Sequence, residues 1–332
     1  MGEHRAAALA ALSALQVHSP TSYSWCGTTS LPLSPEVESA MSPDVAQEFL
    51  LYQLQQELYN NFYCRGFPAP GESRSGRLNP LGSPAFVARL AASNRGRGSL
   101  QPGWQIQGEE DGQLVVERDG LSLWVSPTQT IPAMQAPGIV SLRLPNELRK
   151  ASPGFYLALG ESSLEEEQSV QLVRMYWHLT SAAAALLLDR LTSSLNRSRI
   201  PFQLKVVDDP DRYSRCDAGV LYVPQAHYPE VMPAVRATYE LLRGELRATT
   251  PALTKQLAPG LGLAEDPGDG QSFGMHRMQL LARAALRAHA QGAESVQERT
   301  LVLQEAFAEE ELDLDRPYLS SASSDRYELS IA

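Results

Sequence analysis

The clearest local signal in the sequence is an Asp-Gly pair between two stretches rich in β-branched, aromatic and other apolar residues. The segment reads LVVERDGLSLWV, with Asp119 and Gly120 at its centre. Asp-Gly suits a two-residue β-hairpin turn, because both central positions of that turn need a positive φ angle. The strands of such a hairpin pair antiparallel, so the sequence predicts an antiparallel sheet around this turn.

The other predicted strands and helices follow one another without a regular β-α-β order. Helices are expected near residues 44–61, 83–94, 181–196, 228–246, 272–290 and 293–311, and strands near residues 138–144, 154–159, 170–176, 202–207 and 218–223. This irregular order predicts an α+β protein, in which a mixed or antiparallel sheet region packs with several helices in a single globular domain. We expect an amino-terminal arm or linker at residues 1–43, the α+β domain at residues 44–319 and a carboxy-terminal tail at residues 320–332.

Charge and cysteine content exclude several classes of protein. Acidic residues outnumber basic ones, 38 against 28, which gives a formal net charge of −10. Such a chain lacks the basic excess that binding to nucleic acid or to an anionic membrane requires. The three cysteines are far apart and lack the spacing of metal ligands, which favours a cytoplasmic protein without a disulfide framework or zinc site.

Two further features bear on membranes and secretion. The alanine-rich opening predicts an amphipathic helix or a frayed start rather than a secretory signal. No apolar stretch approaches the roughly 20 residues that a membrane-spanning helix needs. We therefore expect no membrane partner.

Lysine is scarce, and one lysine lies in the middle of a predicted strand. The chain has three lysines, Lys150, Lys205 and Lys255, and uses arginine at its other basic positions. An arginine stays charged, whereas a lysine can be tuned to lose its proton and act as a base. Side chains alternate along a strand, so Lys205 lies on the face opposite to the predicted core residues Phe202, Leu204 and Val206.

The residues that follow this strand extend the candidate site. A turn at residues 208–210 and an antiparallel return would bring Lys205 near Arg215 and Asp217. Two simpler interpretations stay open. Lys205 can extend from a strand edge into solvent, or Asp217 can form a structural ion pair with Lys205 or Arg215.

A glycine-rich loop at residues 259–274 precedes a predicted helix. His276 and Arg277 fall in the first turn of that helix, where backbone amides can bind an anion. The loop lacks the Gly-Lys-Ser/Thr of a nucleotide P-loop, and its Glu265 and Asp266 would repel phosphate unless they are neutralised. A single histidine near a helix start is more often structural than catalytic.

Several phrases, taken in order, resemble one known family. They are GLSLWV, SPGFYLALG, LVRMYWHLT, SLNRSRIPFQLKV, YSRCDAGVLYV, TKQLAPGLGLAEDPGDGQSFGMHR and PYL. They are similar to the A1 branch of the HopA-type family, first described among type III secreted effectors and distinct from the similarly named phosphothreonine-lyase effectors. The similarity covers residues 46–319. Members also occur in gene clusters for modified ribosomal peptides, including lanthipeptide-like products.

The resemblance implies a phosphoserine/phosphothreonine lyase that acts on a phosphorylated precursor peptide beside a separate kinase-like enzyme. Phosphate elimination leaves dehydroalanine or dehydrobutyrine and needs a base for the Cα proton, cations for the phosphate and often an acid for the leaving group. By residue type, Lys205 is the candidate base and Asp217 an orienting carboxylate. The candidate acids are His276 and Tyr213, and the candidate phosphate ligands are Arg215, Lys255 and Arg277. This chemistry requires no metal or organic cofactor.

A function of a different class stays open. The chain can be a non-catalytic, effector-like or accessory protein that binds a peptide or another protein. The positions of four cations distinguish the two alternatives: Lys205, Arg215, Lys255 and Arg277. Elimination gains support if they meet in one pocket, and binding gains support if each pairs with a separate carboxylate.

Overall fold

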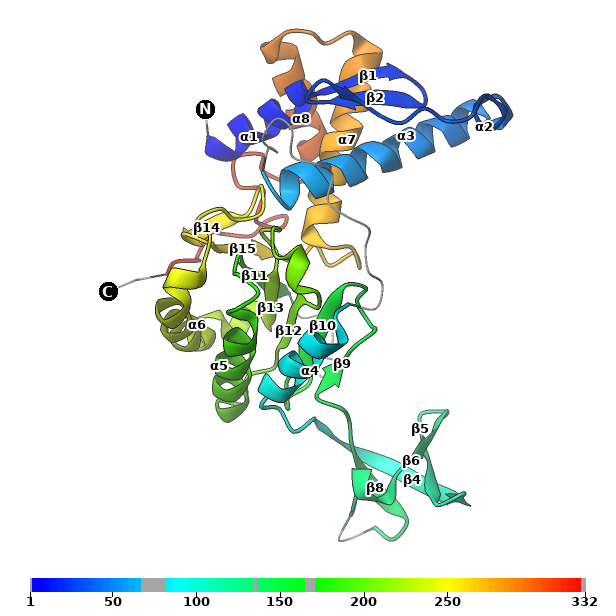
Figure 1. The fold of residues 1–332 in the computed structure, drawn as a ribbon, viewed down its shortest axis with the longest axis vertical. Coiled ribbons are helices and arrows are strands. Elements are labelled where there is room, and N and C mark those ends of the chain that lie inside the picture. The colour runs from blue at the N-terminus through cyan, green and yellow to red at the C-terminus, as the bar shows by residue number, and fades with distance from the viewer. Residues whose placement is uncertain (1, 67–81, 134–135, 165–170, 330–332) are drawn as a thin grey trace.

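The computed structural model describes residues 2–66, 82–133, 136–164 and 171–329. Figure 1 shows three regions along the longest axis: a helical region that includes both α1 and α8, a central sheet with helices beside it, and a smaller sheet that projects from the other end. The eight α-helices in the described residues are α1 (Glu3–Ala14), α2 (Pro35–Ala40), α3 (Pro43–Leu58), α4 (Pro84–Ser93), α5 (Ala184–Arg197), α6 (Tyr228–Leu242), α7 (Phe273–Gln291) and α8 (Val296–Ala308).

All three sheets in these residues are antiparallel, which confirms the predicted α+β class. The three-stranded sheet has the order β1 (Leu15–Ser19), β2 (Ser22–Trp25), β3 (Thr28–Thr29). The seven-stranded sheet has the order β14 (Lys255–Ala258), β15 (Leu261–Glu265), β11 (Leu172–Trp177), β13 (Gly219–Pro224), β12 (Gln203–Val207), β10 (Phe155–Leu159), β9 (Glu147–Leu148). The five-stranded sheet has the order β6 (Leu121–Val125), β5 (Gln113–Arg118), β4 (Leu100–Glu110), β8 (Ile139–Arg143), β7 (Thr130–Pro132).

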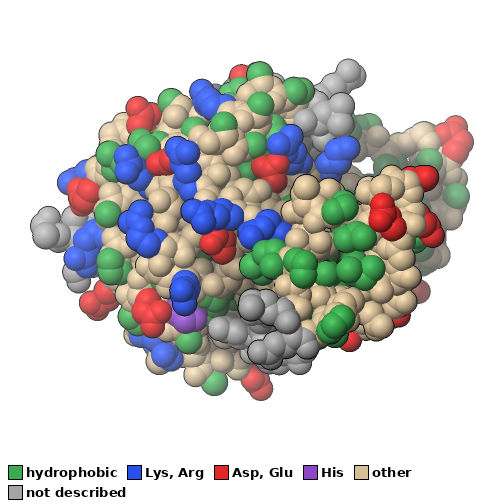
Figure 2. Space-filling model, turned by 90° about the horizontal axis from the view of Figure 1, so that it is seen from below, with side chains coloured by type: hydrophobic (Ala, Val, Ile, Leu, Met, Phe, Trp, Pro, Cys, Tyr) green, Lys and Arg blue, Asp and Glu red, His purple; other side chains and the backbone are tan. Residues whose placement is uncertain are grey.

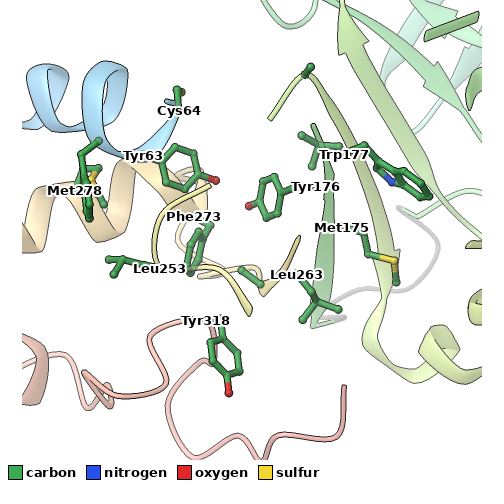
Figure 3. Packing of buried hydrophobic residues seen from close by; sticks show 14 of the residues in the cluster. Tyr63, Cys64, Met175, Tyr176, Trp177, Leu253, Leu263, Phe273, Met278 and Tyr318 are labelled. Atoms are coloured by element: carbon green, nitrogen blue, oxygen red, sulfur yellow. The ribbon is translucent and has the colours of Figure 1, made fainter. Parts of the chain in front are cut away.

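The two faces of the seven-stranded sheet have different neighbours. On one face, residues such as Leu204 and Trp177 are buried, and α5 contacts β12 on this side of the core and packs against α6. On the other face, Tyr176 meets Tyr63 and Phe273, with ring centroids 6.3 and 6.5 Å away. Figure 3 shows these three rings pointing toward one another, while Trp177 points to the opposite side of its strand. The face that carries Tyr176 therefore packs against α7 and the end of α3.

A single π-helical turn at Tyr59–Tyr63 continues α3 and brings its aromatic residues to that face. Tyr63 packs closely on α7, because a Cβ atom at Gly274 would lie only 2.5 Å from the Tyr63 ring. This close approach requires glycine at the second residue of α7. The π turn therefore fixes the distance between α7 and the sheet.

Residues at the amino terminus contribute to the main core. Ala8, Leu9, Ala11 and Leu12 of α1 are buried, and α1 contacts both α7 and α8. The Tyr23 hydroxyl of β2 donates to Glu57 of α3 at 2.9 Å. Residues 1–43 thus contain an ordered helix and hairpin, while the predicted domain boundary after residue 43 stays a prediction.

The carboxy-terminal segment is held by a buried carboxylate. Glu265 has no exposed surface. Its oxygens accept hydrogen bonds from the side chains of Gln225, Ser323 and Tyr327 and from the backbone N–H of Ser320. Four donors offset the desolvation of this carboxylate and fix residues 320–327 against β15.

Serine side chains cap the starts of several helices. Ser42 caps α3 and Ser272 caps α7, each accepting a backbone N–H three residues later. The sequence offers Thr180 and Ser181 as caps for α5, but α5 starts after Ala183 without a side-chain cap. The Thr180 hydroxyl instead donates to Glu245 at 2.5 Å, a residue distant in sequence.

The glycine-rich loop expected at residues 259–274 is wrong in part, because Leu261–Glu265 forms β15 and pairs with β11 and β14. Residues 66–83, whose glycines and prolines predict a loop, lie mostly outside the described residues.

The five-stranded sheet has its own small core. Trp104, Val116, Val125, Val140 and Leu142 are its buried residues. The predicted hairpin joins β5 to β6, and Asp119 and Gly120 have φ angles of 51° and 79°. Both central residues therefore adopt the left-handed conformation that the Asp-Gly pair predicts.

Candidate functional site

Lys205 lies on the sheet face that is covered by α7 and the π turn. It is the central residue of β12 and pairs with Leu157 of β10 and Val220 of β13. Its ammonium lies 4.5 Å from the centroid of the Phe155 ring and 5.7 Å from that of Tyr222. Among the described residues it has no hydrogen bond or ion pair with a carboxylate. Lys205 is thus a half-buried cation held by two aromatic faces.

Arg215 and Asp217 form a buried ion pair next to Lys205. Nη2 of Arg215 donates to Oδ2 of Asp217 at 2.8 Å, and Nε donates to Oδ1. Burial raises the pKa of Asp217. The charge and hydrogen bonds of Arg215, with a contribution from the charge of Lys205, outweigh burial and hold that pKa below its usual value. The structural ion pair left open by the sequence is therefore present, and it lies within the candidate site.

The same pair is joined to the π turn. The Tyr59 hydroxyl accepts from Nη2 of Arg215 at 3.2 Å, and the Cys64 sulfur lies 3.4 Å from the same nitrogen. Irregular π turns of this kind are frequent at functional sites. Here the turn supplies polar contacts that position the guanidinium over the Phe155 ring, 5.1 Å from its centroid.

Arg174 adds a third cation that sequence reasoning missed. It pairs with Tyr222 across β11 and β13, and its guanidinium lies 5.2 Å from the Tyr222 ring centroid. Nε of Arg174 donates to Asp266 at 2.6 Å, and Nη2 donates to the carbonyl of Gln271 at 3.0 Å. This contact links the sheet to the loop before α7.

Together these side chains form one continuous group, which we call the Lys205 cluster: Arg215, Phe155, Lys205, Tyr222, Arg174 and the carboxylates Asp217 and Asp266. Cations and rings alternate along it, since Phe155 contacts Arg215 and Lys205, and Tyr222 contacts Lys205 and Arg174. With two carboxylates and three cations, the cluster has one net positive charge when Lys205 is protonated. Such a group can attract an anion that reaches Lys205.

Tyr213 is buried outside this cluster. Its hydroxyl donates to the backbone carbonyl of Val207 at 2.7 Å, and its ring meets Phe86 edge-on. Burial raises the pKa of Tyr213. None of its hydrogen bonds or ring contacts reaches Lys205, Arg215 or Asp217.

His276 and Arg277 contact each other on α7. Nη1 of Arg277 lies 2.7 Å from Nδ1 of His276, and the Arg277 guanidinium donates to the carbonyls of Pro317 and Leu319 at 2.8 and 3.0 Å. Burial lowers the pKa of Arg277 to about 10. Burial and the charge of Arg277 also lower the pKa of His276. Arg277 is only 1% exposed. Besides the contact with His276, its guanidinium hydrogen bonds are made to the carboxy-terminal segment and not to the Lys205 cluster.

Lys255 lies at the start of β14. Its ammonium contacts both oxygens of Asp325 at 2.7 and 2.6 Å. The structure thus brings together Lys205, Arg215 and Asp217, and it gives Lys255 and Arg277 partners in the carboxy-terminal segment.

The described residues contain no group of three or more His, Cys, Asp and Glu side chains arranged to hold a metal ion. Within the same part of the chain, no helix combines the length and the apolar character that a membrane crossing needs.

Residues 147–319, which contain every member of the Lys205 cluster, match the HopA1 effector protein family. The chain belongs to this family. The resemblance found in the sequence is therefore confirmed at the level of the family, and a search of curated proteins gives no match.

The comparison with solved structures found two effector proteins. One is an effector protein from Pseudomonas syringae pv. tomato strain DC3000, with 14% identity, a TM-score of 0.47, and coverage of 83% of this chain and 96% of that chain. The other is an effector protein from Pseudomonas syringae pv. syringae strain 61, with 13% identity, a TM-score of 0.48, and coverage of 96% of this chain and 98% of that chain.

Proposed function

We propose that this HopA1-family protein is a cytoplasmic lyase that removes phosphate from phosphoserine or phosphothreonine in a precursor peptide of lanthipeptide-like biosynthesis. The observation that carries the proposal is the environment of the Lys205 side chain. Its ammonium has no carboxylate partner among the described residues, is half-buried and lies between two arginines that share its aromatic neighbours. By contrast, the Lys255 ammonium is neutralised by Asp325.

In this reaction each cation of the Lys205 cluster has a role. Neutral Lys205 takes the Cα proton of the phosphorylated residue, the electron pair forms the Cα–Cβ double bond, and the Cβ–O bond breaks. Phosphate leaves with that bonding pair. Arg215 and Arg174 are suited to attract the phosphate through their positive charges. Asp217 orients Arg215 through two hydrogen bonds.

The other predicted residues stay predictions. The roles of His276 and Tyr213 as proton donors require contact with a bound peptide. The roles of Lys255 and Arg277 as phosphate ligands require it too. The hydrogen bonds that these side chains form in the structure are to other parts of the protein. A separate kinase-like enzyme would supply the phosphorylated peptide. The elimination itself needs no cofactor.

A phosphothreonine peptide and its phosphoserine counterpart test the proposal by mass spectrometry. The wild-type protein is expected to produce the dehydrated peptide with loss of phosphoric acid. Lys205→Ala and Lys205→Arg are expected to reduce this rate by at least about 100-fold, because arginine keeps the charge but does not act as a base. Lys150→Ala, which changes an exposed lysine, is the matched control.

Two outcomes would contradict the proposal. Full activity in both Lys205 variants would remove Lys205 from the role of base. Absence of elimination on both phosphopeptides by the folded wild-type protein, when these peptides bind, would favour the alternative of a non-catalytic peptide-binding protein. That alternative is favoured by one specific observation, the exposed edge of the five-stranded sheet.

A further inference from the structure

Strand β6 is an exposed edge of the five-stranded sheet. In the described residues it pairs with β5 on one side and has no neighbour on the other. Leu121 is 55% exposed and Trp124 is 54% exposed. Figure 2 shows apolar side chains gathered on the surface of this projecting sheet.

The hairpin geometry determines which backbone groups point away from β5. Residues that flank a two-residue turn exchange both backbone hydrogen bonds, so Arg118 and Leu121 form a hydrogen-bonded pair. The alternation then directs the N–H and C=O groups of Leu121, Leu123 and Val125 toward β5. The corresponding groups of Ser122 and Trp124 point outward, where an extended chain can pair with them.

Other strand edges in the described residues carry features that discourage pairing. The edge strand β7 has three residues and ends in proline, and β3 and β9 have two residues each. The edge strand β14 begins with Lys255 and has a bulge, and β1 also has a bulge. Natural sheets use short strands, proline, lysine and bulges in this way to prevent pairing with other chains. β6 reads LSLWV, has no charged residue and pairs with β5 in a regular register.

The chemistry around β6 indicates what kind of chain fits it. Glu117 is the cross-strand partner of Ser122, and Glu110 accepts a hydrogen bond from the Trp124 indole at 2.9 Å. Glu109 and Asp111 are exposed at the turn between β4 and β5. In Figure 2 acidic side chains lie at the rim of this sheet. A segment with basic side chains complements this rim, whereas a second copy of β6 would bring the same carboxylates against one another.

We infer that β6 is a docking strand for an extended peptide segment of alternating apolar and basic residues, which adds to the sheet as a sixth strand. The peptide pairs with the backbone of Ser122 and Trp124, and one of its apolar residues covers the Trp124 ring. This surface is separate from the Lys205 cluster and does not depend on the elimination chemistry.

Tryptophan fluorescence gives a direct assay. Trp25, Trp104 and Trp177 are at most 4% exposed, so acrylamide quenching of the native protein reports mainly on Trp124. A short unphosphorylated peptide of alternating lysine and valine is the probe, and its binding is expected to reduce quenching at least about twofold. Because this peptide has no phosphate, failure of the elimination assay leaves the result unaffected.

Substitutions at the outward-facing position separate backbone pairing from general attraction. Ser122→Pro removes an outward N–H and leaves the bonds to β5 in place, since proline is tolerated at solvent-facing positions of edge strands. We expect about tenfold weaker peptide binding. Ser122→Thr retains the N–H and is the matched control. Circular dichroism and urea unfolding are the measurements that check whether both variants fold.

Three results would overturn the inference. They are unchanged quenching of Trp124 by saturating peptide, equal peptide affinity in the folded Ser122→Pro and wild-type proteins, and equal affinity for a glutamate–valine peptide. A concentration-dependent dimer that Ser122→Pro abolishes would also overturn it, because a second copy would then occupy the edge.

Discussion

The buried pair of Arg215 and Asp217 gives the sharpest prediction for stability. The two side chains are 15% and 5% exposed, and two hydrogen bonds join them. Asp217→Asn keeps the size of the side chain but leaves the guanidinium without its negative partner. Removing one member of a buried ion pair costs about 3–5 kcal/mol, because the remaining charge is not compensated. This is a large part of the roughly 5–15 kcal/mol that stabilises a typical domain.

Urea unfolding followed by far-UV circular dichroism measures this cost. Asp313→Asn is the matched control, because its partner Arg316 is 55% exposed and Asp313 is 46% exposed. An exposed pair contributes about 0–1 kcal/mol, so the control is expected to unfold near the wild-type midpoint. The double variant Arg215→Leu/Asp217→Leu is expected to lose less stability than the sum of its single variants, since no charge is left unpaired. A loss below about 1 kcal/mol for Asp217→Asn would refute the reasoning.

The pH dependence provides an independent check on the same pair. The folded-state pKa of Asp217 lies below its ordinary value of 3.8. The stabilisation is therefore complete well above pH 3.8 and is lost as the pH falls through the folded-state pKa. Asp217→Asn lacks this carboxylate, so the difference in free energy of unfolding between wild type and variant is expected to shrink in acid. If the difference in free energy of unfolding between wild type and Asp217→Asn stayed constant as the pH fell below 3.8, the lowered pKa of Asp217 would be contradicted.

Three further predictions concern other parts of the molecule. Gly274→Ala is expected to cost about 1–3 kcal/mol by overpacking against Tyr63, as measured by urea unfolding, whereas Gly244→Ala, with no atom within 4 Å of the added Cβ, is expected to be neutral. Glu265→Ala removes the acceptor of four hydrogen bonds and is expected to cost about 3 kcal/mol and to speed hydrogen exchange at residues 320–327; unchanged exchange would contradict the anchoring role. The pKa of His276 is lowered from 6.5, so wild-type stability is expected to fall as the pH drops below 6.5, and His276→Gln is expected to reduce that fall, as thermal unfolding across this range measures.

Features that depend on neighbouring residues were predictable from the sequence. The Asp119-Gly120 turn, the start of α7 near residue 272 and the alternating faces of β12 are all as predicted, because each depends on a few consecutive residues. The proximity of Lys205 to Asp217 was also predictable, since β12 and β13 are joined by a short connection. Local chemistry therefore indicated the centre of the candidate site.

Features that depend on distant pairing were not predictable in the same way. Arg174 joins Lys205 only because β11 pairs with β13 in a register that places Arg174 beside Tyr222. The partner of Lys255 is Asp325, which is separated from it by 70 positions. Sequence pattern identifies which face of a strand a side chain occupies, but it does not fix which distant strand or tail lies opposite.

The packing of α1 has a consequence for synthesis of the chain on the ribosome. The apolar face of this helix is covered by α7 and α8, which begin about 260 and 280 residues after the end of α1 and therefore emerge from the exit tunnel later. At about 5–20 residues per second, that interval lasts roughly 15–60 s. During this time Leu9 and Leu12, which are buried in the folded protein, lack their native cover.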